Sequence, residues 1–282
     1  MKQQWTLRRR LYNGGMRGLV WLCAGLTCAL LIFLIGYIFY RGVPGLSWQL
    51  ISGQTSYIRN TVGILPNLLN TLYIILVAMV VVLPLGVGAA IYLTEYAASG
   101  RLVRIIEFAA ETLTGIPSII FGLVGMMLFV QKLGLQAGIL AGGLTLVIMI
   151  LPTIITVAQS ALDAVPARYY EGALALGVDH EHAVFKVVAP AAASGIMAAI
   201  VLGLGRAIGE TMAVVMVAGN MPIIPDSLLS GVRTMTANIV LEMGYAADLH
   251  REALIATGVV LFVFILLITM LLNVIRKRGE AR

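Results

Sequence analysis

The sequence predicts an all-α membrane protein with six transmembrane helices. Of its 282 residues, 60% are hydrophobic and 11% are charged, whereas about a quarter of the residues of a soluble domain carry a charge. The apolar residues form long unbroken runs, and runs of 18 or more indicate spans, because lipid offers the backbone no hydrogen-bond partner. Lysine and arginine concentrate in alternate segments between these runs, as in proteins that cross the bilayer repeatedly.

The first apolar run follows Arg8, Arg9 and Arg10, a pattern that signal peptides share. The run extends over 19–40, which is longer than the apolar core of a signal peptide, and no small-residue cleavage site closes it. We therefore expect a retained first span. The six predicted spans are residues 17–40, 68–93, 116–130, 139–158, 191–217 and 253–275.

The later runs are interrupted in different ways. Pro84 lies inside the second span and predicts a kink that neighbouring helices accommodate, and Pro152 lies near the end of the fourth. A short charged segment with Arg101 and Glu111 precedes the third span. An amphiphilic segment, 162–189, precedes the fifth, and its pattern is typical of helices rather than of a disordered loop.

The distribution of charge predicts the orientation. With the N-terminus in the cytoplasm, 13 lysines and arginines fall on the cytoplasmic side and 5 on the opposite side, which places both termini in the cytoplasm. The same bias accounts for the net charge of +6 without nucleic-acid binding. The predicted organisation is a cytoplasmic tail, a six-span domain with a cytoplasmic loop, and a second cytoplasmic tail: residues 1–16, 17–275 (loop 160–190) and 276–282.

Several kinds of site are not expected. Cys23 and Cys28 are five residues apart on one helix and do not face each other well, so we predict no disulfide. The Asp-His-Glu-His sequence at 179–182 resembles a metal site superficially, but adjacent residues on a turn rarely converge on one ion. The chain has no Gly-x-x-x-x-Gly-Lys-Ser/Thr loop to hold a nucleotide. All three histidines lie outside the spans, so we expect no enzyme, metal or bound cofactor.

Two charged residues interrupt the fifth span. Arg206 and Glu210 lie near the middle of an apolar helix, where a charge costs about 2.5 kcal/mol or more, so such residues usually face the bundle interior or water. Their spacing of four places them on one helix face, where they can pair. Gly203, Gly205 and Gly209 would let a helix or a ligand approach.

The cytoplasmic loop contains a recognisable motif. It reads Glu-Gly-Ala-Leu-Ala-Leu-Gly over 171–177 and, after nine residues, Val-Val-Ala-Pro over 187–190. This resembles the Glu-Ala-Ala-x-x-x-Gly-x9-Ile-x-Leu-Pro motif of permease subunits of bacterial ABC importers, with departures at Gly172 and Ala189. In that family the motif forms two short helices that dock on the ATP-hydrolysing subunit. The resemblance implies a type I importer permease fold whose coupling residues are Glu171, Gly172, Ala173, Gly177, Asp179 and Pro190.

The residues of the loop agree with this interpretation. An apolar face is expected on the helix that precedes Gly177, and this glycine is suited to end it. A helix with such a face has to bury it against something. The alternative to a partner subunit is that the face packs on the chain's own spans or lies among lipid headgroups.

Two further segments resemble the phosphate-specific (Pst) permeases. They are Gly-Ile-Pro-Ser-Ile-Ile-Phe-Gly at 115–122 and Gly-Arg-Ala-Ile-Gly-Glu-Thr at 205–211. Those permeases act as a heterodimer of two similar subunits, PstA and PstC. The segment 91–97 resembles PstA and the segment 210–220 is nearer to PstC, and we lean to PstA. The resemblance covers about residues 60–275.

The resemblance implies a function and a set of partners. The chain would carry inorganic phosphate across the bacterial cytoplasmic membrane by alternating access. Its partners would be a second homologous permease subunit, two copies of an ATP-hydrolysing subunit, and a periplasmic or extracellular phosphate-binding protein, within membrane lipid. ATP would be hydrolysed by the partner. A planar guanidinium matches phosphate oxygens with two parallel hydrogen bonds, and the expected pathway residues are Arg206, Glu210, Thr211, Ser118 and Asn220.

Alternatives remain at the level of the sequence. Arg206 and Glu210 also suit a structural ion pair that fixes helix packing and touches no substrate. A permease for another oxyanion, molybdate or sulfate, would share the loop motif. An intramembrane enzyme would need a nucleophile with a base or a cluster of histidines and carboxylates in the spans, and a passive channel would need no docking loop.

Overall fold

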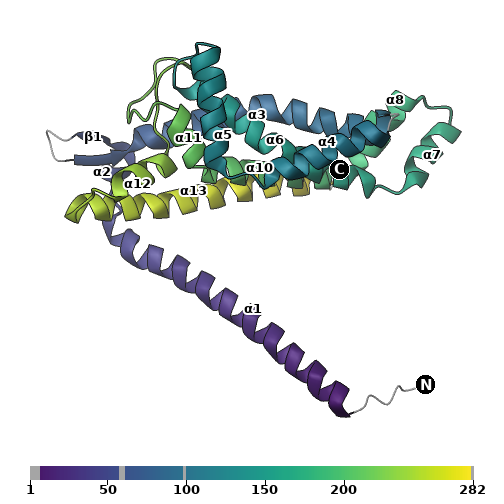
Figure 1. Cartoon of the computed structure of the whole chain (residues 1–282), viewed down its shortest axis with the longest axis horizontal. Helices are drawn as coiled ribbons and strands as arrows, with labels where there is room; N and C mark the ends of the chain where they lie inside the picture. Colours follow the sequence, from purple (N-terminus) through teal and green to yellow (C-terminus); the bar gives the residue numbers. More distant parts are fainter. Residues whose placement is uncertain (1–6, 57–60, 98–99, 281–282) are drawn as a thin grey trace.

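The computed structural model describes residues 7–56, 61–97 and 100–280, and most of its long helices lie side by side in one bundle (Figure 1). The helices are α1 (Leu7–Gly42), α2 (Trp48–Ser52), α3 (Leu65–Ile91), α4 (Gly100–Thr114), α5 (Ser118–Gly125), α6 (Ile139–Asp163), α7 (Ala167–Ala175), α8 (His180–Ala183), α9 (Ala189–Ala191), α10 (Ala193–Gly209), α11 (Met212–Val217), α12 (Met235–Met243) and α13 (Asp248–Glu280). The strands β1 (Gln54–Ser56) and β2 (Thr61–Ile64) pair antiparallel. Shorter turns of 3-10 or π-helix are Val43–Gly45, Tyr92–Tyr96, Met126–Lys132 and Val184–Val188.

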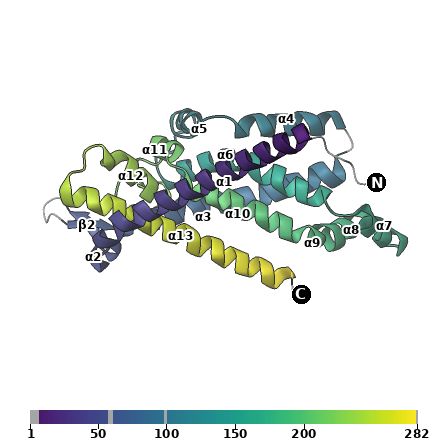
Figure 2. The ribbon, with the colours of Figure 1, turned by 90° about the horizontal axis from the view of Figure 1, so that it is seen from below.

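The bundle has two distinct ends. The helices α7 and α8 lie at one of them, which we call the loop end, and the strands, α2 and α12 lie at the other, which we call the hairpin end (Figures 1 and 2). The end of α13 and the beginning of α1 both lie toward the loop end (Figure 2). These two helix ends and the long loop thus share one side of the bundle.

Four of the described helices are long and apolar enough to cross a membrane, and two bent helix pairs bring the number to six if each pair is one span. This is the number that the sequence predicts. The helices α1 and α13 extend beyond the predicted spans, since α1 begins at Leu7 and α13 continues to Glu280.

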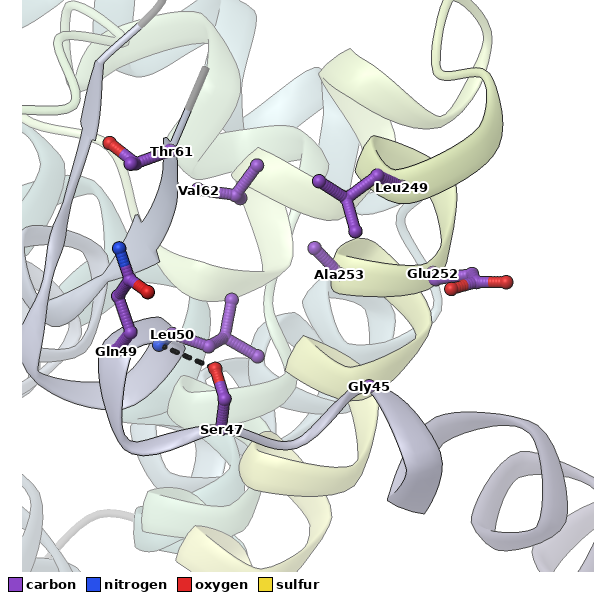
Figure 3. A pocket seen from close by; sticks show the side chains of 9 residues that line it. All are labelled: Gly45, Ser47, Gln49, Leu50, Thr61, Val62, Leu249, Glu252 and Ala253. Atoms are coloured by element: carbon purple, nitrogen blue, oxygen red, sulfur yellow. Dashed lines mark hydrogen bonds between the residues drawn. The ribbon is translucent and has the colours of Figure 1, made fainter. Parts of the chain in front are cut away.

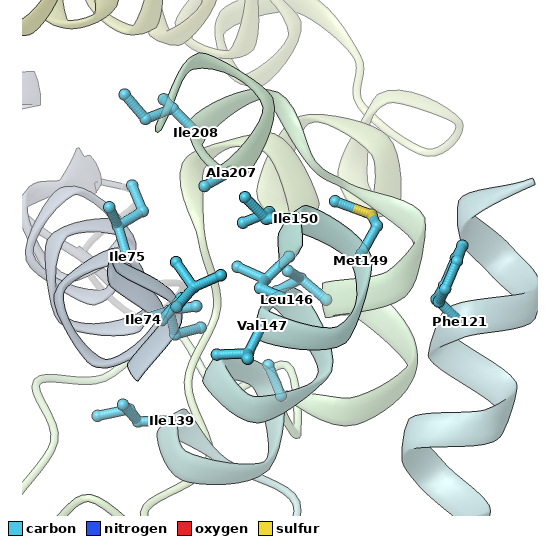
Figure 4. Packing of buried hydrophobic residues seen from close by; sticks show 14 of the residues in the cluster. Ile74, Ile75, Phe121, Ile139, Leu146, Val147, Met149, Ile150, Ala207 and Ile208 are labelled. Carbon is cyan, nitrogen blue, oxygen red and sulfur yellow. The ribbon is translucent and has the colours of Figure 1, made fainter. Parts of the chain in front are cut away.

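The centre of the bundle is α6. Its apolar window is 67% buried, compared with 33% for that of α3 and 22% for that of α13. Isoleucines of α3 and the end of α10 pack around it (Figure 4). Two glycines allow a close approach to α3: a Cβ atom on Gly143 would lie 2.6 Å from Cγ1 of Val77, and one on Gly86 would lie 2.7 Å from Cγ2 of Ile154.

The third span differs from its prediction. The charged segment before it is the helix α4, and α4 and the helical segment 118–132 that follows it are bent by 105° to each other. The corner lies at Gly115-Ile116-Pro117, because a proline disfavours the helical conformation of the residue before it and its own backbone is extended here (ψ 137°). The segment that resembles the phosphate permeases therefore builds a corner rather than the start of a straight span.

The first span stands apart from the rest of the chain. None of the residues in its apolar window is buried. The helix α1 meets the bundle only at its C-terminal end and points away from it elsewhere (Figure 1). Its contact with α13 is confined to its last turns, where the rings of Phe39 and Phe262 meet edge to face at 5.5 Å and Gly42 lies against Val259. Cys23 and Cys28 are free and exposed on α1, as predicted.

We expect Gly122→Ala to destabilise the contact between α5 and α11. A Cβ atom there would lie 2.8 Å from the Cα of Ala213, so backbone would have to move, and such overpacking costs about 1–3 kcal/mol. Thermal unfolding of the purified protein measures the loss. Gly88→Ala is the matched control, because its Cβ would meet nothing within 4 Å. Equal midpoints for the two variants would contradict the proposed packing.

Candidate functional site

Residues 160–190 run from the last turn of α6 to the start of α9 and form short helices at the loop end (Figure 1). We call this segment the helical loop. Gly177 ends α7 with a positive φ of 82°, a conformation that glycine adopts without strain. Its N–H donates to the carbonyl of Leu174 at 2.9 Å, and the N–H of Val178 donates to that of Ala173 at 3.2 Å. These two bonds satisfy the last carbonyls of the helix and confirm the predicted end at Gly177.

Asp179 begins α8. Its Oδ1 accepts hydrogen bonds from the N–H of His182 at 3.1 Å and from Nδ1 of the same residue at 2.6 Å. The backbone N–H of His182, and secondly its ring, lower the pKa of the Asp179 carboxyl, so the cap stays ionised to a lower pH than an ordinary aspartate. Within the described residues no group of three metal-ligating side chains occurs, and the motif at 179–182 serves as a helix cap.

The helical loop is anchored on one side and exposed on the other. The hydroxyl of Tyr170 shares a hydrogen bond of 2.8 Å with Nδ1 of His180, whose ring meets that of Tyr96 edge to face at 4.7 Å. Val184 and Val188 are buried in a cluster with residues of α3 and α6. Large apolar side chains remain exposed on the loop, and Leu176 is 86% exposed. These exposed side chains are Tyr169, Leu174, Leu176 and Phe185.

The predicted coupling residues divide between these two sides. Ala173 is buried. The exposed members are Glu171, Gly172, Gly177, Asp179 and Pro190.

The fifth span is interrupted, which the sequence did not predict. The helix α10 ends at Gly209, the backbone of Glu210 is extended (ψ 136°), and α11 starts at Met212. The carbonyl of Glu210 accepts a hydrogen bond of 2.8 Å from Oγ1 of Thr236 on α12, and its Oε1 accepts one of 3.0 Å from the N–H of Ala213. These partners replace the helical bonds that the break removes, as a membrane-embedded break requires.

The break separates the two charged residues. The prediction that Arg206 and Glu210 share one helix face is wrong, because α10 ends at Gly209, between them. The two residues form no ion pair in the described part of the chain. Nη1 of Arg206 instead donates to Oγ1 of Thr153 on α6 at 3.0 Å. Both charged side chains are half-buried.

The glycines around Arg206 have different surroundings. A Cβ atom on Gly203 would press on Ile150 and Ile154 of α6, whereas one on Gly205 or Gly209 would meet nothing within 4 Å. The face of α10 that carries Gly205 and Gly209 is therefore open in this chain.

The other predicted pathway residues make local bonds or none. Oγ1 of Thr211 donates to the carbonyl of Gly209 at 3.3 Å, at the break itself. Asn220 has a positive φ of 57°, and its Nδ2 donates to the carbonyl of Val215 at 2.7 Å, so it closes the turn after α11. Ser118 is the first residue of α5 and is half-buried.

A polar network near α12 was missed. Arg233 donates to Oε1 of Glu242 at 2.6 Å, to the carbonyl of Asn220 at 2.9 Å and to Oδ1 of Asn238 at 3.3 Å. Nε2 of His250 lies 3.5 Å from Oε2 of Glu242. Asn238 and Glu242 are four residues apart on α12, but Arg233 and Asn220 lie outside this helix and His250 lies on α13, so no helical spacing connects them to it. Thr153 was missed for the same reason, since its partner is 53 residues away.

The hairpin end has a pocket of about 300 Å³ between α2, β2 and the start of α13 (Figure 3). Oγ of Ser47 accepts a hydrogen bond from the N–H of Leu50 at 3.1 Å and fixes the turn that forms its floor. Gln49 and Thr61 contribute polar groups on one side, and Glu252 lies on the opposite wall.

Comparison with known proteins identifies the family of the chain. A family model described as the binding-protein-dependent transport system inner membrane component matches residues 82–280. The chain belongs to this family. It is therefore a multi-pass permease subunit of an ABC importer and an inner membrane component.

Individual members of this family are similar over most of their length. The probable ABC transporter permease protein YqgI of Bacillus subtilis is 35% identical over 76% of this chain and 72% of its own. The phosphate transport system permease protein PstC of Mesorhizobium japonicum is 36% identical over 84% of this chain and 83% of its own. These similarities support a permease of the PstA/PstC type. The phosphate permease named here is a PstC protein and does not favour the lean to PstA.

Solved ABC permeases share the fold. A chain of the bacterial alginate ABC transporter, in complex with an alginate-bound periplasmic protein, superposes with a TM-score of 0.65 at 13% identity and covers 95% of this chain and 98% of its own. A chain of the inward-facing MetNI methionine ABC transporter superposes with a TM-score of 0.58 at 22% identity, over 75% of this chain and 91% of its own. At these identities the likeness concerns the type I importer fold alone.

We expect two glycine substitutions in the helical loop to act in opposite directions. Gly177→Ala forces an alanine into the left-handed conformation, which costs about 1–2 kcal/mol. Gly172→Ala lies inside α7 with nothing within 4 Å of its Cβ, and it should stabilise the helix by about 1 kcal/mol. Amide hydrogen exchange over residues 167–175 measures both effects, and faster exchange in Gly172→Ala would contradict this account of α7.

Proposed function

We propose that this permease carries inorganic phosphate across the membrane by alternating access, and that a separate ATPase subunit drives it through the helical loop. The observation that carries the assignment of phosphate is Arg206, a half-buried guanidinium beside a break in a spanning helix. Interrupted helices mark the substrate sites of many transporters. A guanidinium offers a planar pair of donors that matches phosphate oxygens. The similarity to PstC proteins supports the same substrate.

Glu210 would contribute selectivity rather than attraction. Its Oε1 already accepts the N–H of Ala213, and its other oxygen can accept a hydrogen bond from a protonated phosphate oxygen. Sulfate and molybdate are fully deprotonated at neutral pH and have no such proton to donate. This argument favours phosphate over the other oxyanions, whose permeases would share the loop. We place Thr211, Ser118 and Asn220 along the same route as polar lining.

The helical loop would be the docking element. Its anchored side attaches it to α3 and α6, while Leu176, Leu174 and Phe185 stay exposed and need a partner in water. We infer that this partner is the ATP-hydrolysing subunit, present in two copies, so that this chain needs no nucleotide site of its own. The loop end would then face the cytoplasm with both termini, in agreement with the distribution of lysine and arginine.

The second permease subunit would bind to the exposed α1, and the phosphate-binding protein would bind to the hairpin end. An apolar helix with almost no contact to its own chain suits a second, homologous permease subunit. The hairpin end would face the phosphate-binding protein that delivers the anion.

We expect Arg206→Gln to lower phosphate uptake by about tenfold or more, because a hydrogen bond to a charged group contributes about 1.5–3 kcal/mol. Arg206→Lys keeps the charge without the planar fork and should be impaired as well. Thr153→Val removes the partner that orients Arg206 and should lower uptake less. Uptake is measured together with the amount of assembled complex. Normal uptake by Arg206→Gln in a fully assembled complex would contradict the pathway role and favour a structural role.

We expect Glu171→Lys to release the ATPase subunit from the permease, because it reverses a charge on the exposed side of the helical loop. Co-purification with the ATPase subunit measures the contact. Asp226→Lys makes the same change of charge at an exposed position between α11 and α12 and serves as the control. If Glu171→Lys retains both co-purification and full activity, the docking role of the loop is wrong.

The anion that stimulates ATP hydrolysis tests the substrate. The purified complex, supplied with its binding protein, should respond to phosphate and not to sulfate or molybdate.

A further inference from the structure

The outer face of α4 carries an unused pair of arginines over an apolar surface. Arg101, Arg104, Ile105 and Phe108 line a shallow pocket of about 440 Å³. Arg104, Ile105 and Phe108 follow Arg101 by three, four and seven residues, which places all four side chains on one side of the helix. Phe108 is 71% exposed and Ile105 is 62% exposed, so the pocket continues into an apolar wall.

The two arginines have no acidic partner within the described part of the chain. Nε of Arg104 donates to the carbonyl of Gly100 at 3.0 Å. This hydrogen bond does not use the two terminal nitrogens of the guanidinium. Glu107, one turn further along, accepts a hydrogen bond of 2.5 Å from Nε2 of Gln159 on α6 and forms no ion pair with Arg104. The positive charge on the outer face of α4 is thus uncompensated by the residues that the structure describes.

The place of this face in the bundle identifies its surroundings. Gly100 lies three residues after Ala97, and the preceding Tyr96 contacts His180 of the helical loop. The start of α4, and with it the pair of arginines, therefore lies toward the loop end (Figure 2). In the orientation proposed above, with the loop end facing the cytoplasm, this is the border between hydrocarbon and headgroups. Ile105 and Phe108 lie one and two turns further along α4, away from its start at Gly100.

We propose that Arg101 and Arg104 bind the phosphate group of an anionic phospholipid, whose acyl chain packs on Ile105 and Phe108. The guanidinium fork favours phosphate oxygens, and a basic pair next to an apolar surface at the membrane border is complementary to both parts of such a lipid. A free phosphate ion would use the arginines but would leave the two large apolar side chains uncovered. The four residues lie on the exposed side of α4, whose buried residue is Ala110. Arg206 is on α10 and binds Thr153, so this site is separate from the proposed transport route.

The test measures lipid binding by the full chain assembled with its partner subunits. The complex is placed in nanodiscs of phosphatidylcholine with increasing phosphatidylglycerol, and retained phosphatidylglycerol is counted by native mass spectrometry. We expect Arg101→Gln and Arg104→Gln each to weaken phosphatidylglycerol binding about fivefold, and the double variant to weaken it about 25-fold. Lys132→Gln is the matched control, because it removes one exposed positive charge outside α4 and should leave this binding unchanged.

Further arms distinguish the other occupants. Ile105→Ser with Phe108→Ser should weaken phosphatidylglycerol binding although both arginines remain, and inorganic phosphate should not displace the lipid. Unchanged phosphatidylglycerol binding in the arginine double variant overturns the proposal. Equal displacement by inorganic phosphate overturns it in favour of a free phosphate site. Loss of the second permease subunit from the double variant, with lipid binding intact, overturns it in favour of a subunit contact. These readouts do not depend on which anion is transported.

Discussion

The packing of α6 in the centre of the bundle is the constraint on which the other elements depend. Its apolar faces hold α3 and α10, and its polar side chains hold individual groups on the neighbouring helices: Thr153 binds Arg206, and Gln159 binds Glu107. At its N-terminal end, the carbonyls of Ser230 and Leu228 accept the first N–H groups of the helix. In lipid an unpaired polar group costs several kcal/mol, so each of these bonds restricts where its partner element can lie.

The helix α10 connects the two parts of the molecule to which we assign function. It begins just after α9, at the end of the helical loop, and it ends at the break beside Glu210. A helix of 17 residues is about 25 Å long and is stiff along its axis. A displacement of the helical loop would reach Arg206 and the break along α10, after the 66° bend between His180–Ala191 and Ala193–Gly209. The hydrogen bond from Thr236 to the carbonyl of Glu210 ties the break to α12. If the backbone at the break moves, α12 either moves with it or this hydrogen bond breaks.

The sequence predicted the number of spans, the helical loop and its end at Gly177, because these follow from long apolar runs and from local turn chemistry. It did not predict the break at Glu210. Apolar residues continue on both sides of that position, and the bonds that stabilise the break come from Thr236, 26 residues away. The corner before α5 could have been read from Pro117, but its angle depends on the packing of α5 against α11. Charge pairs across segments, such as Arg233 with Glu242, leave no periodic trace at all.

The length of α1 determines how far the subunit can extend beyond the bilayer. Thirty-six helical residues extend about 54 Å, whereas the hydrocarbon of a bilayer is about 30 Å thick. If α1 stands upright it is also longer than the bilayer with its headgroups, which is about 40–45 Å thick, whereas a strong tilt would bring the two lengths close to each other. Its first turns, which include Asn13 and Arg17, are the polar ones. An upright α1 would therefore place these polar turns outside the bilayer on the side of the loop end, where a soluble partner of the subunit could contact them.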